Sequence, residues 1–503
     1  MTREARVLIS CGLVWGLVTS LPHAMAAALP PAGRWFTGFL FFQDDFFQYL
    51  SFAEQAARGH VLFENKFALF AHDPFLFNPE WWLAGILSVP FGGNPAAGFH
   101  VLGLLSAAAL WLAAGRLLAD GGGGGQGLAW RVCLFATGGG LGVWRALRGV
   151  PFSRIPDLGM CVAPWSQAVY GSAHAILSTA LLLSSLMWLV RWLSAGAKRW
   201  PWIAAASALA LVRPFDALLF GCVAAVLIAL QPGTLPERAQ RPAELLWLLP
   251  VALYDLLAFG FHPAFATWTS SQNAVVSPPL KEMLFAFGPA LALALPTLRG
   301  PKDALVPRAV RRALWLVVAS ISLALPSGLS FALQFANSLG AALLLLAALA
   351  LPRRIVPAAV LVMAPSSCAL LWVLLNPAPQ WFAPNDYLVM TREIRARASP
   401  GDRVMAPVDL GLLVAAYTPC RVVVGHRVVT PDYAERSSEA VSFYDPATTE
   451  HWRLAYLKAV DARWLAMPSS PQPWVHDGSF AIAARAPGWE LWQRRLAPSP
   501  FTP

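Results

Sequence analysis

The chain has 503 residues, of which 57% are hydrophobic and only 13% are charged. About a quarter of the residues of a soluble enzyme would be charged, so the composition excludes an ordinary water-soluble protein. The formal net charge of +10 comes largely from basic residues in short segments between apolar runs, and it gives no reason to expect nucleic acid as a partner.

Apolar runs near or above the length of a bilayer crossing recur along the chain. They predict an α-helical multi-pass membrane protein with about eleven spans. The expected spans are 6–29, 95–118, 128–148, 173–192, 200–213, 215–231, 244–261, 281–298, 312–326, 331–350 and 355–375. The fifth and sixth are short and are separated by Pro214, so one bent or re-entrant element fits that stretch nearly as well.

The basic residues predict the orientation of these spans. They fall in alternate loops, as the positive-inside rule requires of cytoplasmic loops. The amino end is then cytoplasmic, and the loop at about 30–94 and everything after about residue 376 lie outside a plasma (inner) membrane. The first residues also resemble a cleavable signal peptide, but the apolar run continues to about residue 30 and favours a retained first helix.

The first outer loop begins with two adjacent acids in the stretch FLFFQDDFFQYLSFAEQAARG. Its apolar residues recur at helical spacing, which predicts an amphipathic helix on the outer membrane surface, beginning at Asp44 or Asp45 and ending before Gly59. A helix N-cap would explain one acid but not two in succession. The second acid therefore suggests a chemical role at the membrane face.

After residue 376 the composition becomes mixed. Strand-like runs alternate with helical stretches at about 385–398 and 432–461, which predicts a small external α/β domain over 376–503 beside a transmembrane domain over 1–375. The strand-like runs are RVMAP, RVVVG, WLAMP and FAIAARA.

The first loop resembles that of the C-type membrane glycosyltransferases, the GT-C superfamily. The resemblance rests on the acids after the first span, on an aromatic four residues after Asp45 (Tyr49), and on the proline-aromatic segment HDPFLFNPEWWLAGILSVPFG. It is closest to uncharacterised bacterial members and extends to GGGLGVW, PD at 156–157, SAHA at 172–175, RPFD at 213–216, SPP at 277–279 and GHRVVTPDY at 425–433. The chain departs at RPFD, where similar sequences have His before the proline, and this puts a role for Arg213 in doubt.

The resemblance implies transfer of a sugar from a polyprenyl phosphate or pyrophosphate at the outer membrane face. A carboxylate would take the proton from the acceptor hydroxyl as its oxygen attacks the anomeric carbon. Asp45 is the first candidate for this general base, and Asp44 is the second.

Arginines near the outer face are candidates for binding the leaving phosphate: Arg148, Arg154 and Arg213. Each is also explained as an interfacial anchor, and Arg213 could simply pair with Asp216 three residues on. Tyr49, Asp157 and His174 are further substrate-binding candidates, although a structural histidine explains His174 equally well.

No spacing of His, Cys, Asp and Glu reaches a metal motif, and no cofactor is required. A divalent cation bridging Asp45 and phosphate remains an option, because hard cations favour such oxygens and members of the superfamily differ in this respect. The expected partners are a lipid-linked sugar donor, a lipid, glycan or protein acceptor, and the membrane. The alternative function is a carrier or scaffold that binds lipid-linked saccharide without catalysis.

Overall fold

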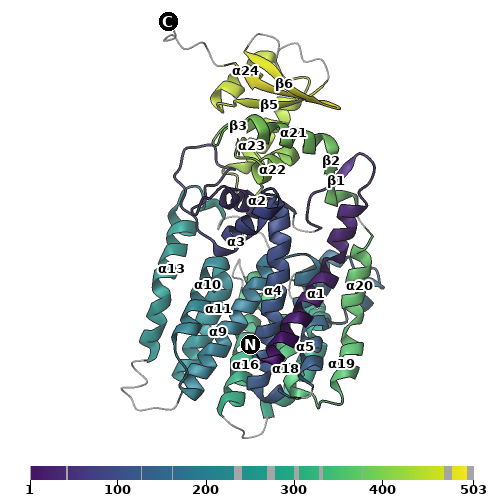
Figure 1. Cartoon of the computed structure of the whole chain (residues 1–503), viewed down its shortest axis with the longest axis vertical. Coiled ribbons are helices and arrows are strands. Elements are labelled where there is room, and N and C mark those ends of the chain that lie inside the picture. Colours follow the sequence, from purple (N-terminus) through teal and green to yellow (C-terminus); the bar gives the residue numbers. More distant parts are fainter. Residues whose placement is uncertain are drawn as a thin grey trace. The chain divides into compact units, whose positions relative to one another are not determined.

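The computed structural model describes residues 2–40, 43–125, 127–160, 163–231, 241–268, 278–299, 305–327, 332–376, 378–469 and 479–495. The chain divides into two compact units, whose elements are drawn in Figure 1. Unit 1 comprises residues 1–25, 100–257 and 272–377, and unit 2 comprises residues 26–99, 258–271 and 378–503.

The described part of unit 1 is helical. Its elements are α1 (Arg3–Ala28), α4 (Pro95–Leu118), α5 (Leu128–Thr137), α6 (Gly142–Ala146), α7 (Pro156–Gly159), α8 (Pro164–Val169), α9 (Ala173–Ala195), α10 (Trp200–Val212), α11 (Pro214–Ala229), α13 (Leu249–Leu256), α15 (Leu280–Ala294), α16 (Leu305–Ala324), α17 (Ala332–Phe335), α18 (Leu339–Ala350), α19 (Val356–Met363) and α20 (Pro365–Leu374).

The helix lengths confirm a multi-pass membrane protein. Within the described ranges, seven helices are long and apolar enough to cross a membrane, and the pair α19 and α20, bent by 42°, makes eight if it is one span. Helices lie in all eleven expected stretches, but α5, α10 and α11 have only 10, 13 and 16 residues. The count of eleven spans is therefore not confirmed.

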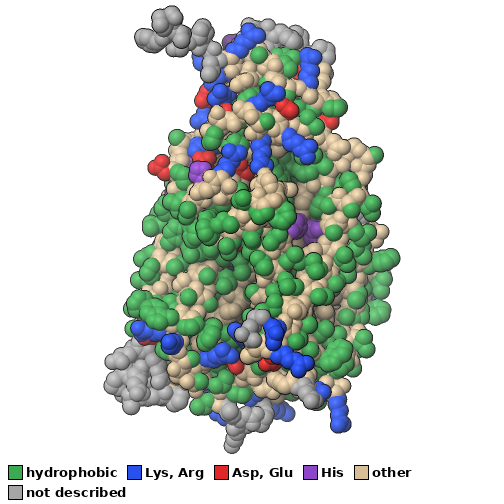
Figure 2. All heavy atoms as spheres, in the orientation of Figure 1, with side chains coloured by type: hydrophobic (Ala, Val, Ile, Leu, Met, Phe, Trp, Pro, Cys, Tyr) green, Lys and Arg blue, Asp and Glu red, His purple; other side chains and the backbone are tan. Residues whose placement is uncertain are grey.

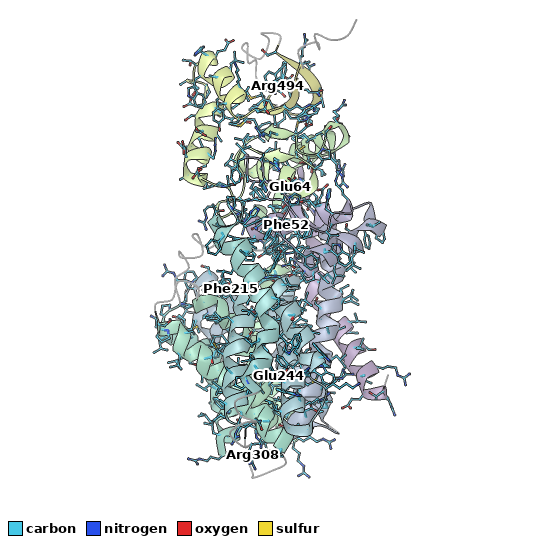
Figure 3. All side chains as sticks on the ribbon, turned by 90° about the vertical axis from the view of Figure 1, so that its left-hand side faces the viewer. Phe52, Glu64, Phe215, Glu244, Arg308 and Arg494 are labelled. Atoms are coloured by element: carbon cyan, nitrogen blue, oxygen red, sulfur yellow. The ribbon has the colours of Figure 1, made fainter. Side chains whose placement is uncertain are left out.

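The surface of unit 1 suits a bilayer. Figure 2 shows hydrophobic side chains over the sides of its helices and Lys and Arg gathered around one end of them. Arg308 of α16 marks that end in Figure 3. Helix α1 belongs to this bundle, because a Cβ added at Gly12 would lie 2.8 Å from the Cα of Ala108 on α4.

The span expected over 128–148 is not one unbroken helix, because the chain leaves the helix between α5 and α6. There the carboxylate of Asp157 accepts the backbone N–H groups of Gly140 (2.9 Å) and Gly142 (3.1 Å). A Cβ on Gly140 would lie 2.2 Å from the carbonyl oxygen of Ala286, so this position admits only glycine. Successive glycines favour helix poorly, and Asp157 offers their N–H groups another acceptor.

Unit 2 contains both the first loop and the C-terminal segment, residues 378–503. Its elements are β1 (Arg34–Phe36), α2 (Gln43–Ala57), α3 (Pro79–Ser88), β2 (Phe382–Pro384), α21 (Asn385–Arg397), β3 (Arg403–Met405), α22 (Val408–Tyr417), β4 (Arg421–Val422), α23 (Tyr433–Tyr444), α24 (Glu450–Ala459), β5 (Trp464–Pro468), β6 (Phe480–Ala486) and β7 (Trp489–Arg494). Strands β1 and β2 pair antiparallel, with Trp35 opposite Ala383. The unit resumes at Ala378, near the predicted boundary, but it also contains the first loop.

The described residues of the C-terminal segment, 378–469 and 479–495, form a five-stranded sheet in the order β4-β3-β5-β7-β6. Strand β3 pairs parallel with β4 and β5, whereas β7 pairs antiparallel with β5 and β6. The sequence predicted four of these strands and the helices α21, α23 and α24. Strand β7 and helix α22 were missed.

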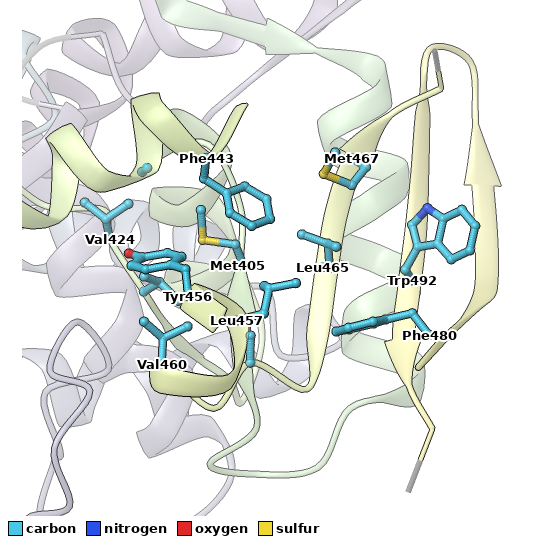
Figure 4. Close-up of a cluster of buried hydrophobic side chains, with 13 residues drawn as sticks. Met405, Val424, Phe443, Tyr456, Leu457, Val460, Leu465, Met467, Phe480 and Trp492 are labelled. Atoms are coloured by element: carbon cyan, nitrogen blue, oxygen red, sulfur yellow. The ribbon is translucent and has the colours of Figure 1, made fainter. Parts of the chain in front are cut away.

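The sheet is held by a core of buried side chains. Phe443 and Tyr456, from α23 and α24, meet Met405 and Leu465 of the central strands in Figure 4. Trp492 of β7 belongs to the same cluster and is only 4% exposed. The five-stranded sheet and its helices therefore have a hydrophobic core of their own. Full burial of each such side chain contributes about 1.5–3 kcal/mol to the free energy of folding.

Candidate functional site

The two acids lie in the first turn of α2, where negative charge is favoured by the helix dipole. The helix ends at Ala57, and Gly59 follows with φ of +93°, a left-handed conformation that glycine adopts without steric cost. The predicted helix and its end before Gly59 are therefore confirmed, whereas the helix begins at Gln43, before both acids, and its location on the outer membrane surface stays a prediction. Neither acid precedes the helix as a cap.

Aromatic packing fixes one side of α2. The ring of Phe46 stacks on Phe39 with centroids 3.9 Å apart, and Tyr49 stacks on Trp81 of α3 at 5.4 Å. Phe52, labelled in Figure 3, stacks on the same indole at 4.6 Å. Tyr49 is thus part of the packing that holds α2 to α3.

A buried ion pair fixes another side of α2. The ammonium of Lys66 lies 2.6 Å from Glu54 Oε2 and also donates to the carbonyls of Ala415 (3.1 Å) and Thr418 (2.7 Å). Both charged side chains are 1% exposed, and Arg58 also donates to Glu54. Burial alone would raise the pKa of Glu54, but Lys66 and Arg58 lower it below its usual value. This network ties α2 to α22.

Asp45 faces a buried histidine from the GHRVVTPDY segment. Asp45 Oδ1 lies 3.5 Å from His426 Nε2; the carboxylate is 51% exposed and the imidazole 1% exposed. The backbone N–H groups of Val428 (2.9 Å) and Val429 (3.3 Å) donate to His426 Nδ1. A neutral imidazole whose Nδ1 accepts must carry its proton on Nε2, the atom that faces Asp45.

Asp44 is also exposed, but it lines a cleft of about 420 Å³ within unit 2. Residues from β2, α21 and α22 form the other walls, among them Tyr387 and Asp409. The two acids of α2 therefore have different surroundings. Asp45 contacts a fixed imidazole, and Asp44 borders a space large enough for a small ligand.

The other predicted site residues lie in unit 1. Asp157 is buried and accepts backbone N–H groups, and burial raises its pKa although those hydrogen bonds oppose the rise. Arg213 pairs with Asp216 at 2.9 Å, as the alternative interpretation predicted, and donates to Gln334. His174 is half-buried in the first turn of α9.

Arg148 and Arg154 are exposed on the short connections between α6 and α7. The structure brings Asp44, Asp45 and Tyr49 together on α2. For the residues of unit 1, a substrate-binding role stays a prediction.

Sequence reasoning missed His426, Lys66, Tyr387 and Asp409. GHRVVTPDY was singled out, but no role was assigned to its histidine. The signal that could have found Lys66 is a lone cation within an aromatic loop, since a buried ammonium requires a carboxylate nearby. In the part of the chain that the structure describes, no group of three or more His, Cys, Asp or Glu could hold a metal ion.

No protein-family model and no curated protein sequence matches the chain. Solved structures do match it. The oligosaccharyltransferase of Archaeoglobus fulgidus in the apo form aligns over 92% of this chain and 69% of its own length, with a TM-score of 0.52 and 13% identity. The arabinofuranosyltransferase AftD from mycobacteria aligns over 99% of this chain and 40% of its own, with a TM-score of 0.57 and 15% identity.

A third structure matches over nearly the whole of both chains. ArnT from Cupriavidus metallidurans bound to undecaprenyl phosphate covers 97% of each, with a TM-score of 0.54 and 14% identity. All three are GT-C glycosyltransferases. This chain has the GT-C fold. The resemblance stated from the first-loop motifs is thereby confirmed, and at such identities the likeness establishes the GT-C fold alone.

Proposed function

We propose that this protein is a membrane glycosyltransferase that moves a sugar from a polyprenyl phosphate or pyrophosphate to an acceptor hydroxyl. The observation that carries the proposal is a pair of exposed carboxylates, Asp44 and Asp45, on the first turn of α2 in a chain with the GT-C fold. The ArnT structure is bound to undecaprenyl phosphate, which supports a lipid-phosphate donor. The reaction takes place at the extracytoplasmic face of a plasma (inner) membrane. The positive-inside rule predicts that the segments of unit 2 lie on that face.

In the proposed reaction Asp45 is the general base. Its carboxylate takes the proton of the acceptor hydroxyl while the hydroxyl oxygen bonds to the anomeric carbon. The bond between that carbon and the phosphate oxygen breaks, and the polyprenyl phosphate leaves with the bonding electron pair. In this proposal His426 is a positioning residue, because its buried Nε2 lies 3.5 Å from Asp45 Oδ1 and makes no hydrogen bond among the described residues. A small movement of the Asp45 side chain brings Oδ1 within hydrogen-bond distance of Nε2 and leaves Oδ2 for the acceptor.

The deciding experiment measures transfer of label from polyprenyl-phosphate sugars by the full-length protein in nanodiscs. Asp45→Asn should lower transfer by about 10²–10⁴-fold, as expected for removal of a general base. Glu393→Gln, which neutralises a carboxylate on α21, is the control and should leave the rate unchanged. Equal rates for wild type and Asp45→Asn would reject Asp45 as the base, and a loss confined to Asp44→Asn would assign the role to Asp44.

Absence of transfer with every donor tested would favour the carrier or scaffold. Binding of undecaprenyl phosphate without transfer would then separate that function from failure of the assay.

The role of His426 has its own test. His426→Phe should lower kcat by about tenfold or more, the range for a hydrogen bond to a charged group, and His426→Gln should restore part of the rate by supplying an N–H. In an Asp45→Asn background His426→Phe should cost nothing further, since the two act on one proton transfer. Equal losses in both backgrounds would show that His426 does not act through Asp45 and would reject its positioning role.

A divalent cation stays a prediction for this site. Asp44 and Asp45 are adjacent exposed carboxylates, the hard oxygen ligands that Mg²⁺ and Mn²⁺ favour. If a cation bridges Asp45 and the donor phosphate, EDTA should abolish transfer and Mg²⁺ or Mn²⁺ should restore it. Transfer that is unchanged in EDTA would reject the cation.

A further inference from the structure

The cleft beside Asp44 is a second feature of unit 2 to which the proposed chemistry assigns no ligand. Its volume of about 420 Å³ lies in the range of small-molecule sites. Its walls come from both parts of the unit: Asp44 and Phe47 from α2, Tyr387 from α21, and Asp409 and Leu412 from α22. The C-terminal segment therefore supplies a large part of a cleft that opens beside the acid pair.

The charges around the cleft limit what it can bind. Asp44 and Asp409 are exposed carboxylates, whereas the one guanidinium in the described lining belongs to Arg34. Arg34 already donates to the carbonyls of Phe382 (3.1 Å) and Pro379 (3.4 Å), which holds it against the β1–β2 ribbon. Two carboxylates repel an anion, so a phosphate-bearing donor is disfavoured here.

Tyr387 provides a polar group of fixed position. Its ring packs edge-on against Trp489, with centroids 5.6 Å apart and an interplanar angle of 79°. Burial raises the pKa of Tyr387, and the neighbouring Asp409 carboxylate raises it further. The phenol thus stays protonated at neutral pH and is able both to donate and to accept hydrogen bonds.

The remaining walls are apolar. Phe47, Leu412 and Leu413 are 5%, 6% and 2% exposed, so they form a packed surface beside the polar groups. Carboxylates accept hydrogen bonds from hydroxyls, and packed apolar side chains suit the C–H faces of a pyranose or furanose ring. This combination suits a neutral polyhydroxylated ligand.

We infer that the cleft binds the acceptor of the transfer reaction and that this acceptor is an uncharged, hydroxyl-rich saccharide. Asp44, Tyr387 and Asp409 hydrogen-bond its hydroxyls, and Phe47 and Leu412 contact its ring faces. The role of the saccharide as acceptor rests on the proposed function, whereas the binding of a neutral saccharide in the cleft does not.

The test is equilibrium binding to the full-length protein in nanodiscs, followed by saturation-transfer NMR. The probes are the methyl glycosides of glucose, galactose, mannose and arabinofuranose, with methyl glucuronide and glucose 1-phosphate as charged counterparts. We expect at least one neutral glycoside to bind and its charged counterparts to bind more weakly. Binding of none of the neutral probes, or preference for the charged ones, would overturn the inference.

Two variants locate the binding. Tyr387→Phe keeps the ring, and Asp409→Asn keeps the side-chain shape, so both should fold, which thermal unfolding checks. Each should weaken binding of the neutral glycoside by about tenfold, the cost of one hydrogen bond to a charged or polar partner. Glu393→Gln, outside the described lining, should leave binding unchanged. Binding that is indifferent to both cleft variants would also overturn the inference.

Binding and transfer together separate this inference from the proposed function. Glycoside binding that depends on Tyr387 and Asp409 but is never followed by transfer would count against the glycosyltransferase only. Transfer whose KM for the acceptor is unchanged in both variants would count against the cleft only.

Discussion

The two units use their charged side chains in different ways. In unit 1, Arg145 forms two hydrogen bonds to Glu282, Arg191 two to Asp120, and Asp157 accepts two backbone N–H groups. Unit 2 also contains ion pairs, such as Arg421 with Glu64 at 2.6 Å, but there a buried pair, Glu54 with Lys66, supports a helix whose two acids are left exposed.

The difference indicates where to look for chemistry in such a chain. A charged group within or beside membrane helices is costly to leave without a partner, so such groups are usually paired. Exposed carboxylates at a helix start have no such requirement. They are available to a substrate, provided that the helix beneath them is held firmly.

The largest expected effect is the loss of stability when the buried pair of Glu54 and Lys66, which supports α2, is broken. Lys66→Met leaves the Glu54 carboxylate without its buried ammonium and should lower the free energy of unfolding by about 3–5 kcal/mol. Arg58→Met, which removes a partner that is 36% exposed, should cost about 1 kcal/mol or less. Thermal unfolding of the full chain measures both, and similar costs would show that burial of the pair does not support α2.

Asp157→Ala comes next and probes unit 1. Loss of the acceptor for Gly140 and Gly142 should destabilise the protein by about 1–3 kcal/mol, with transfer per folded molecule unchanged. Asp157→Asn keeps one carbonyl acceptor and serves as the control. A fall in transfer comparable to that of Asp45→Asn would instead support the predicted contact with substrate and weaken the comparison between the units.

A fall in pH should destabilise unit 2 by protonating Glu54. The folded-state pKa of Glu54 lies below its ordinary value of 4.5, so its contribution to stability is complete above pH of about 4.5 and is lost as the pH falls through the folded-state pKa. Unfolding midpoints of wild type and Glu54→Gln should therefore differ at pH 7 and converge in acid. A difference that is independent of pH would mean that Glu54 does not titrate as an ion pair.

The smallest effect concerns Tyr49. Tyr49→Leu loses the stack on Trp81 and should cost about 0.5–1.5 kcal/mol, whereas Tyr49→Phe keeps it and should be nearly neutral for stability. Transfer by Tyr49→Phe then isolates the hydroxyl. A reduced rate at unchanged stability would support the substrate contact that the family resemblance implies.

The sequence predicted those parts of the fold that depend on local pattern. Helix α2 and its glycine end, four strands of the sheet and most membrane helices follow from periodicity, hydropathy and turn residues. The break at Gly140 did not, because a glycine cluster in an apolar run resembles helix packing until the acceptor at Asp157 is known. Strand β7 was missed because WELWQR, with its polar residues, has little β signal of its own and is defined by pairing with β5.

The candidate site could be predicted only in part for a related reason. Asp44 and Asp45 stand out as neighbours in sequence, but His426 and Asp409 belong to segments far along the chain. Glu54 looks like an ordinary surface residue of an amphipathic helix, and only the fold shows that Lys66 is buried against it. Local pattern thus predicts the acids, whereas the contacts that orient them depend on long-range folding.

The pairing of β1 with β2 has a consequence for the order of synthesis. Because the ribosome makes the chain from its amino end, Arg34–Phe36 are made long before Phe382–Pro384, and all of the membrane helices after α1 are made between them. The carbonyls of Ala415 and Thr418, which accept from Lys66, and the imidazole of His426, which lies beside Asp45, are also made late. A nascent or truncated chain therefore carries its two acids without the groups that fix them, and unit 2 matures only after the last membrane helix has been inserted.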